Sequence, residues 1–373
     1  MTDQNTDQLF DLSLTEEQRI TRENMLRFAE QEVKSISRPA DEAAAAPEGF
    51  YDKTVELGLS LLPIPEEFGG AGMPRSPMSN VLNAEDLGSG DMSLAIGSLT
   101  PLAFINTVLD QGTEAQQEKY LTPLAAETFK AATIALMEPR ATFEPSELET
   151  SAKKEGNGYV INGVKSMVAL AADAEFILVV ANVEGQGPAG FVVEKGAEGL
   201  KIEKEDYMGL RPLELNRVTL ENVLVDASAK LGEEEKAFDL QRLVDLSRIG
   251  LAAIAVGCCQ SVLDYVVPYV NERVAFGEPI SHRQSVAFMV ANIAIELDGM
   301  RMMVYRAASR AEQGLDFHKE AYLAQVLCAE KAMEIGTNGV QLLGGHGFTR
   351  EHPVELWYRN LRCVGLLSGV ASV

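Results

Sequence analysis

The chain has 373 residues, which is enough for one large domain or two to three ordinary domains around a substantial core. Hydrophobic residues make up 46% and charged residues 23%, a composition typical of globular proteins and not of disordered chains. The formal net charge of −23 argues against nucleic acid and anionic membranes as main partners, because both would repel such a surface.

Several further classes are disfavoured by local sequence. The start, MTDQNTDQLFDLSLTEEQ, has neither a basic region nor an apolar stretch, so we predict no signal or transit peptide. No run of eighteen apolar residues occurs, which predicts no membrane span. The four histidines show no metal-ligand spacing with Cys or carboxylates, so we predict no metal. The cysteines lack CxxC spacing, which predicts buried free thiols and a cytoplasmic protein: Cys258, Cys259, Cys328 and Cys363.

The first part of the chain, from about Leu14 to Phe129, is predicted to be helical. Its segment TEEQRITRENMLRFAEQEVK places apolar residues three and four positions apart, the period of an amphipathic helix. Thr15 with Gln18 three residues later fits a capping box. Pro63, Pro65 and the run FGGAGMP interrupt the pattern, so a loop should separate two helical portions.

From about Ala131 to Asp226 the hydrophobic period changes to two. The segments GYVINGVKSMV, EFILVVANVEG, AGFVVEKGAEGL and LNRVTLENVLV are short, rich in β-branched residues and separated by Gly and Asn. This spacing predicts a small domain of antiparallel strands with a barrel-like form.

Helical periodicity then returns. The stretch LVDLSRIGLAAIAVGCCQSVLDYVVPYV is apolar on most faces, which is typical of a buried helix in a bundle. Two more helices are predicted at about Arg283–Gln313 and Asp316–Leu343, both rich in Ala, Met and Leu. The predicted fold is therefore α+β and multidomain, with an N-terminal all-α domain at 1–130, a middle antiparallel β-barrel-like domain at 131–229 and a C-terminal four-helix bundle at 230–373.

Four stretches carry a resemblance to a known family: PIPEEFGGAG, MEPRATFEPSELETSAKKEGNGYVINGVKS, NERVAFGEPISHRQSV and QLLGGHGFTREHPVELWYRNLR. Together, and in this order, they resemble the acyl-CoA dehydrogenase family over essentially the whole chain. The resemblance implies an FAD-dependent oxidoreductase of fatty acid metabolism. In that family FAD binds between the β-domain and the C-terminal bundle, an acyl-CoA thioester undergoes α,β-dehydrogenation, and electrons pass to an electron-transfer flavoprotein.

The resemblance also implies which residues meet FAD. Arg273 suits a pyrophosphate because a guanidinium pairs well with phosphate oxygens, and Gln284 would meet the adenosine half. The GG-x-G turn lets backbone amides approach a ligand, although it would serve equally well as a helix C-terminus. Part of this set would serve a neighbouring subunit, which implies a homodimer or homotetramer. The implied FAD contacts are Met137, Met167, Ala169, Arg273, Phe276, Gln284, Gln341, Gly344 and Gly345.

Two residues of the segment VDLSRIG match the family's substrate contacts. Asp245 would meet the CoA part of the ligand, and Arg248 would support the helix beside it. The alternative is a simple ion pair three residues apart on a helix, which contributes a few tenths of a kcal/mol.

The sequence departs from the family at the catalytic base. The two positions where members carry their active-site Glu are Ser368 and Ser247. A serine hydroxyl does not accept a proton unless another base activates it, and general-base catalysis supplies about 10²–10⁴-fold in rate. The family's flavin-contacting Thr and Trp-x-Thr are likewise replaced by Met137, Met167 and Ala169.

Three interpretations therefore stay open. The first is an enzyme with a displaced base, the candidates being Asp91, Glu138 and Asp245; Asp91 also fits a helix cap and Glu138 an ion pair. The second is a catalytically silent subunit that binds acyl-CoA, or completes the FAD site of a complete homologue in a hetero-oligomer. The third is a flavoprotein whose chemistry avoids α-proton abstraction. The acyl chain length is not predicted.

Overall fold

The N-terminal part is helical, as the periodicity predicts. The computed structural model describes residues 13–232 and 237–373, so the segment on which the predicted absence of a signal peptide mainly depends lies largely outside it. The capping box is present, because Thr15 Oγ1 accepts from the Gln18 amide at 3.2 Å and Gln18 Oε1 accepts from the Thr15 amide at 3.1 Å. The helices are α1 (Glu16–Phe28), α2 (Lys34–Ala43), α3 (Phe50–Glu56), α4 (Pro77–Gly90), α5 (Met92–Gln111) and α6 (Glu114–Leu121).

The middle part is a seven-stranded sheet in the order β1-β4-β2-β3-β7-β6, with β5 paired to β4. Most pairs are antiparallel, but β1 and β2 each pair with β4 in parallel, which the sequence prediction missed. Parallel pairing needs a long crossover, and the path from β1 to β4 through two other strands supplies it. The strands are β1 (Ala132–Ala135), β2 (Ser151–Glu155), β3 (Gly158–Ala169), β4 (Phe176–Val183), β5 (Gly187–Glu194), β6 (Leu200–Glu205) and β7 (Leu215–Asp226).

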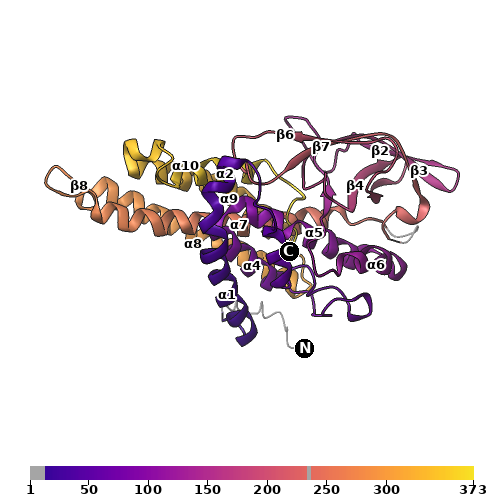
Figure 1. The fold of residues 1–373 in the computed structure, drawn as a ribbon, viewed down its shortest axis with the longest axis horizontal. Helices are drawn as coiled ribbons and strands as arrows, with labels where there is room; N and C mark the ends of the chain where they lie inside the picture. Colours follow the sequence, from indigo (N-terminus) through magenta and orange to yellow (C-terminus); the bar gives the residue numbers. More distant parts are fainter. Residues whose placement is uncertain (1–12, 233–236) are drawn as a thin grey trace, which may run out of the picture.

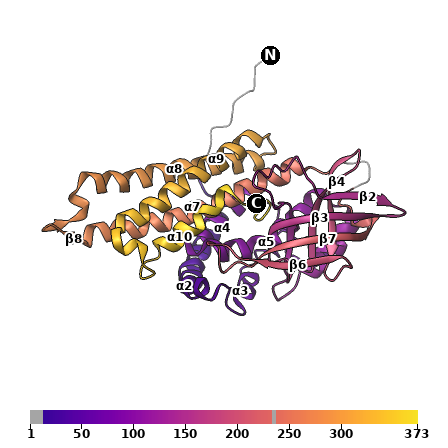
Figure 2. The same ribbon diagram turned by 90° about the horizontal axis from the view of Figure 1, so that it is seen from above.

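The C-terminal part is a bundle of long helices. Two of them form a hairpin whose tip carries the short strands β8 (Val274–Ala275) and β9 (Glu278–Pro279) and projects away from the sheet (Figures 1 and 2). The predicted boundaries of the second and third helices are correct to within two residues. The helices are α7 (Leu240–Glu272), α8 (Gln284–Glu312), α9 (His318–Leu343) and α10 (Val354–Leu361).

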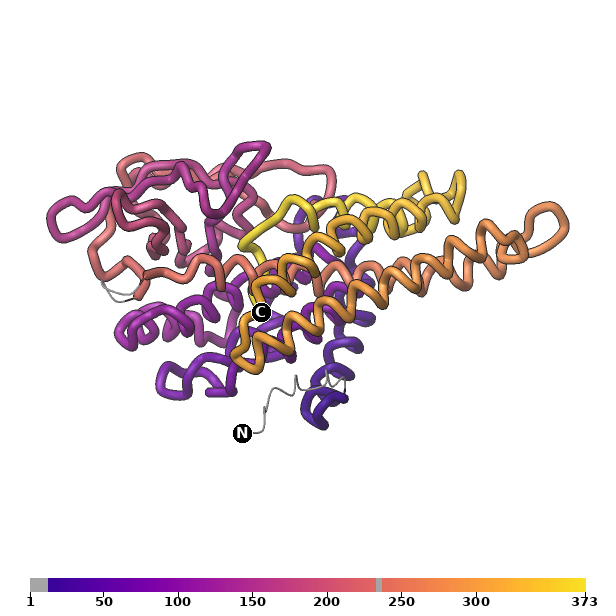
Figure 3. The backbone as a smooth tube through the Cα atoms, turned by 180° about the vertical axis from the view of Figure 1, so that it is seen from behind, coloured from indigo at the N-terminus to yellow at the C-terminus, as the bar shows by residue number. Residues whose placement is uncertain are grey.

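Helices α5 and α7 form the centre of the molecule. By length and apolar composition both would suit a membrane span, but 94% of the apolar stretch of α5 and 78% of that of α7 are buried inside the protein. Figure 3 shows α7 running from the sheet through the bundle to the projecting tip. The burial is that of core helices in a folded chain.

Helices α4 and α7 approach each other at two glycines. A Cβ added at Gly257 would overlap the carbonyl oxygen of Glu85, and one added at Gly88 would overlap the carbonyl oxygen of Ile254. One turn further along α7, the Ser261 hydroxyl donates to the Ser89 carbonyl oxygen at 2.6 Å. The backbones are therefore closer than any side chain at these two positions would permit.

This contact makes a prediction for stability. Gly257→Ala should lower the free energy of unfolding by about 1–3 kcal/mol, because the new methyl group must push the helices apart. Gly299→Ala on α8 is the matched control, since a Cβ there meets no atom within 4 Å, and it should be neutral or stabilise by about 0.5–1 kcal/mol. Urea unfolding followed by circular dichroism measures both. Equal stability of the two variants would contradict the proposed packing constraint.

Candidate active site

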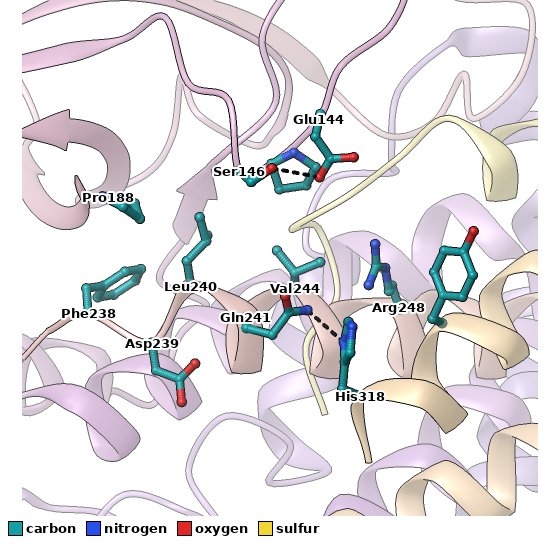
Figure 4. A pocket seen from close by; sticks show the side chains of 12 residues that line it. Glu144, Ser146, Pro188, Phe238, Asp239, Leu240, Gln241, Val244, Arg248 and His318 are labelled. Atoms are coloured by element: carbon teal, nitrogen blue, oxygen red, sulfur yellow. Dashed lines mark hydrogen bonds between the residues drawn. The ribbon is translucent and has the colours of Figure 1, made fainter. Parts of the chain in front are cut away.

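A cavity of about 570 Å³ opens between the sheet domain and the first turns of α7 and α9. This volume lies within the roughly 300–1,000 Å³ typical of small-molecule pockets. Its walls come from the loop after β1, the start of β5, the segment before α7, and both helices (Figure 4). The lining residues are Glu144, Pro145, Ser146, Pro188, Phe238, Asp239, Leu240, Gln241, Val244, Arg248, His318 and Tyr322.

The carboxylate of Asp245 organises the helical wall of this cavity. Asp245 is only 2% exposed, and its Oδ1 accepts from Arg248 Nη1 at 3.0 Å and from Gln241 Nε2 at 3.0 Å. His318 Nδ1 lies 2.9 Å from its Oδ2. Arg248, one of the two predicted substrate contacts, lines the cavity, and Asp245 lies directly behind it. The pair is thus both a helix ion pair and part of a cavity wall.

Ser247 and Ser368 meet beside the same turn of α7. The Gly369 amide donates to Ser247 Oγ at 2.7 Å, and the Ser368 amide contacts Met137 Sδ at 3.1 Å. Among the described residues, no carboxylate or imidazole is hydrogen-bonded to either hydroxyl. The structure therefore brings the two predicted base positions together without giving either serine a base that could activate it.

The residues after Ser368 fill the space next to α7. Val370, Ala371, Ser372 and Val373 are each at most 4% exposed. The carbonyl oxygen of Ala371 lies so close to Gly250 that a Cβ there would overlap it. The carbonyl oxygen of Val373 accepts from Arg75 Nη2 at 2.7 Å. The segment 369–373 is therefore packed into the protein core.

Two further predicted flavin contacts, Met167 and Ala169, lie at the end of β3. Met167 lines a small cavity of about 90 Å³ together with Leu210, from the loop between β6 and β7, and with Leu366 and Leu367 of the C-terminal segment. The amide of Met167 donates to the carboxylate of Glu205 at 2.9 Å. Ala169 is fully buried. This volume is well below the roughly 300 Å³ or more of typical ligand pockets.

The predicted nucleotide contacts lie at the opposite end of the bundle, on and near the tip of the α7–α8 hairpin (Figures 1 and 2). All are exposed, and the side chain of Phe276 is 96% exposed. This end fits a dinucleotide, because a guanidinium, two amide side chains and a glycine turn with open space around it are all accessible to a ligand. The residues are Arg273, Phe276, Gln284, Gln341, Gly344 and Gly345.

The other two candidate bases have structural roles. Asp91 caps α5, where its Oδ1 accepts from the amides of Ser93 at 2.8 Å and Leu94 at 3.0 Å, and burial raises its pKa. Glu138 pairs with the buried Lys165 at 3.0 Å. These contacts support the alternatives of a helix cap and an ion pair. Among the residues described, no group of three or more His, Cys, Asp or Glu side chains could hold a metal ion.

The fold combines a helical domain, a curled sheet and a helical bundle around a cavity. This combination defines the class of the acyl-CoA-oxidising flavoproteins. Family models agree in chain order: the acyl-CoA dehydrogenase N-terminal domain matches residues 15–128, the middle domain 133–223 and the C-terminal domain 239–373. The chain belongs to the acyl-CoA dehydrogenase family, whose members are FAD-dependent oxidoreductases.

Individual relatives match this chain along nearly their whole length. The short-chain specific acyl-CoA dehydrogenase of Clostridium acetobutylicum is 32% identical over 371 residues, with 97% of each chain covered. A subunit of the caffeyl-CoA reductase–Etf complex of Acetobacterium woodii is 32% identical over 368 residues, covering 96% of each. The structure of butyryl-CoA dehydrogenase from Megasphaera elsdenii matches with a TM-score of 0.88 and 30% identity, covering 97% of this chain and 96% of the other.

The buried ion pair beside the site makes a second prediction. Lys165 is fully buried, and its Nζ donates to Glu138 Oε1 and to the Leu136 carbonyl oxygen, each at 3.0 Å. Burial lowers the pKa of Lys165 to about 8, against the attraction of Glu138, so the pair is charged at pH 7. Lys165→Met should lower the free energy of unfolding by about 3–5 kcal/mol, because it leaves a buried carboxylate uncompensated.

The control for this prediction is the double variant Lys165→Met with Glu138→Gln, which removes both charges and should recover most of the loss. Chemical denaturation at pH 7 measures both proteins. A single variant as stable as the unmodified protein would show that the pair is not needed for the fold around β1 and β3.

Proposed function

We propose that the 570 Å³ cavity binds the CoA part of an acyl-CoA thioester, and that the chain takes part in the α,β-dehydrogenation of that thioester. The observation that carries this proposal is the Asp245–Arg248 pair at the cavity wall, in the same turn of α7 as Ser247. Arg248 offers a cation for a phosphate, and the apolar side chains of Leu240 and Val244 offer contact to an uncharged arm. FAD, when bound, supplies the hydride acceptor.

The proposed chemistry also needs a group that removes the α-proton. Asp91 and Glu138 are held in structural contacts, and Asp245 already accepts three hydrogen bonds. A carboxylate whose oxygens already accept several hydrogen bonds has few lone pairs left to take a proton from a substrate. We therefore expect the unmodified chain to dehydrogenate its substrate slowly, with the missing base at Ser368 as the cause.

Restoring the carboxylate tests this proposal. Ser368→Glu should increase the rate at which butyryl-CoA bleaches the flavin absorbance by about 10²-fold or more, since general-base catalysis contributes this much. Ser368→Gln has the same size without a basic group, so it is the matched control. Absorbance of the purified protein, with flavin supplied, gives the flavin content per chain, and stopped-flow absorbance gives the rate.

A second candidate function is supported by the segment 369–373, which packs against Ser247 and Gly250 and leaves about 90 Å³ at the flavin side. In this alternative the chain is a silent subunit that binds acyl-CoA and completes the FAD site of a homologue. The subunit would be supported by a protein that binds CoA but carries no flavin alone and gains it only with a homologue. The enzyme would be contradicted if, in addition, acyl-CoA does not bleach the flavin supplied to Ser368→Glu.

The exposed tip of the α7–α8 hairpin supports a further copy of the chain as partner. Its predicted FAD contacts lie far from Met137 and Met167, so the two sets would form one site only across two chains. Apolar side chains are exposed on the single chain at the tip and along α8, including Phe276 at 96%, Phe288 at 61% and Ile295 at 67%. An electron-transfer flavoprotein and a cytoplasmic location complete the proposal.

This assembly makes a prediction for Phe276. Phe276→Ser should weaken self-association and lower the flavin content per chain, because an exposed aromatic ring of this size belongs in an interface. Leu224→Ser is the matched control: Leu224 is 67% exposed on β7, away from the hairpin, and its loss should change neither property. Analytical ultracentrifugation gives the mass. Identical masses and flavin contents for both variants would rule out the tip as the interface.

A further inference from the structure

His318 is a cavity residue that neither the sequence motifs nor the dehydrogenation chemistry accounts for. It is the first residue of α9, and its side chain, which is 53% exposed, forms part of the cavity wall next to Arg248 and Tyr322 (Figure 4). A half-exposed imidazole in a ligand cavity is available to whatever binds there.

The buried Asp245 fixes the orientation of this imidazole. His318 Nδ1 lies 2.9 Å from Oδ2 and 3.2 Å from Oδ1 of the carboxylate. The Gln241 amide nitrogen lies 2.9 Å from the same Nδ1, but it donates to Asp245 as well. Because a carboxylate only accepts, we place a proton on Nδ1 and direct it to Asp245.

Nε2 of the same ring is then left for a ligand. Among the described residues none forms a hydrogen bond with Nε2. The ring nitrogens point in different directions, so an Nδ1 that faces the buried carboxylate turns Nε2 away from it. This arrangement, in which a carboxylate holds one nitrogen and presents the other, preorganises the imidazole for binding.

Arg248 lies beside His318 on the same wall of the cavity. Asp245 is a single buried negative charge shared between His318 and Arg248, whose guanidinium also lies 5.4 Å from the centre of the Tyr322 ring. Arg248 and the imidazole of His318 are two groups on this wall that can donate to a phosphate oxygen. The charged and titratable groups that line the cavity or adjoin His318 include two on α7, Asp245 and Arg248. The others are Asp316 just before α9, Tyr322 on α9, Asp239 just before α7 and Glu144 on the opposite wall.

We propose that His318 is a ligand-binding residue, in which the protonated imidazole donates from Nε2 to a phosphate oxygen of the CoA group, beside Arg248. This inference rests on the proposed function, because it takes the CoA part of a thioester as the occupant of the cavity. It adds a second cationic contact, supplied by α9, to the pair on α7.

Two substitutions at this position separate binding from structure. His318→Asn keeps a donor near the place of Nδ1 and loses Nε2, so we expect it to weaken the binding of free CoA about 10-fold at pH 6.5. His318→Gln keeps a donor near the place of Nε2 and should stay within about 3-fold of the unmodified protein. Lys319→Gln removes an exposed charge next to His318 that does not line the cavity, and it should bind CoA normally.

Isothermal titration of the full chain with CoA measures these affinities, and thermal melts establish that the variants are folded. Equal affinity of His318→Asn and the unmodified protein would overturn the assignment of His318 while leaving the proposed function intact. Equal weakening by Lys319→Gln would also overturn it, since the effect would then be one of general charge. An unmodified protein that binds no CoA would overturn both the assignment and the proposed function.

Discussion

The close packing of α4 against α7 is the constraint on which the placement of the site depends. Gly88 and Gly257 let the two backbones meet, so α7 can stay buried along most of its length and still reach from the sheet to the hairpin tip. The first turns of α7 lie next to the sheet domain. There Arg248 faces the cavity and Ser247 faces the segment 369–373.

The helices were predictable because their information is local. The stretch that forms α7 is apolar on most faces, and those that form α8 and α9 are rich in Ala, Met and Leu. Thr15 with Gln18 marks the start of α1. The parallel pairing of β1 and β2 with β4 was not predictable from the period of two. Alternation shows which face of a strand is buried, but the identity of its neighbour depends on the path of the chain between them.

The site could be predicted only in part, for the same reason. Asp245 and Arg248 are three residues apart on one helix, so their pairing follows from the sequence. His318 is far along the chain, and no local pattern connects it to Asp245; only the packing of α9 on α7 does. The sequence also did not predict the role of Glu205, whose carboxylate accepts a hydrogen bond from the amide of Met167. The resemblance placed Ser247 and Ser368 at one site, whereas the core packing of the residues after Ser368 emerges only in three dimensions.

The separation between the hairpin tip and the sheet domain has a genetic consequence. If each copy lends its Arg273 end to the Met137 end of another, a defect confined to one end of a chain damages only the site that contains that end. A mixture of chains impaired at the tip with chains impaired at the sheet would then contain assemblies with one intact site. Two alleles that are each inactive alone would complement each other when expressed together.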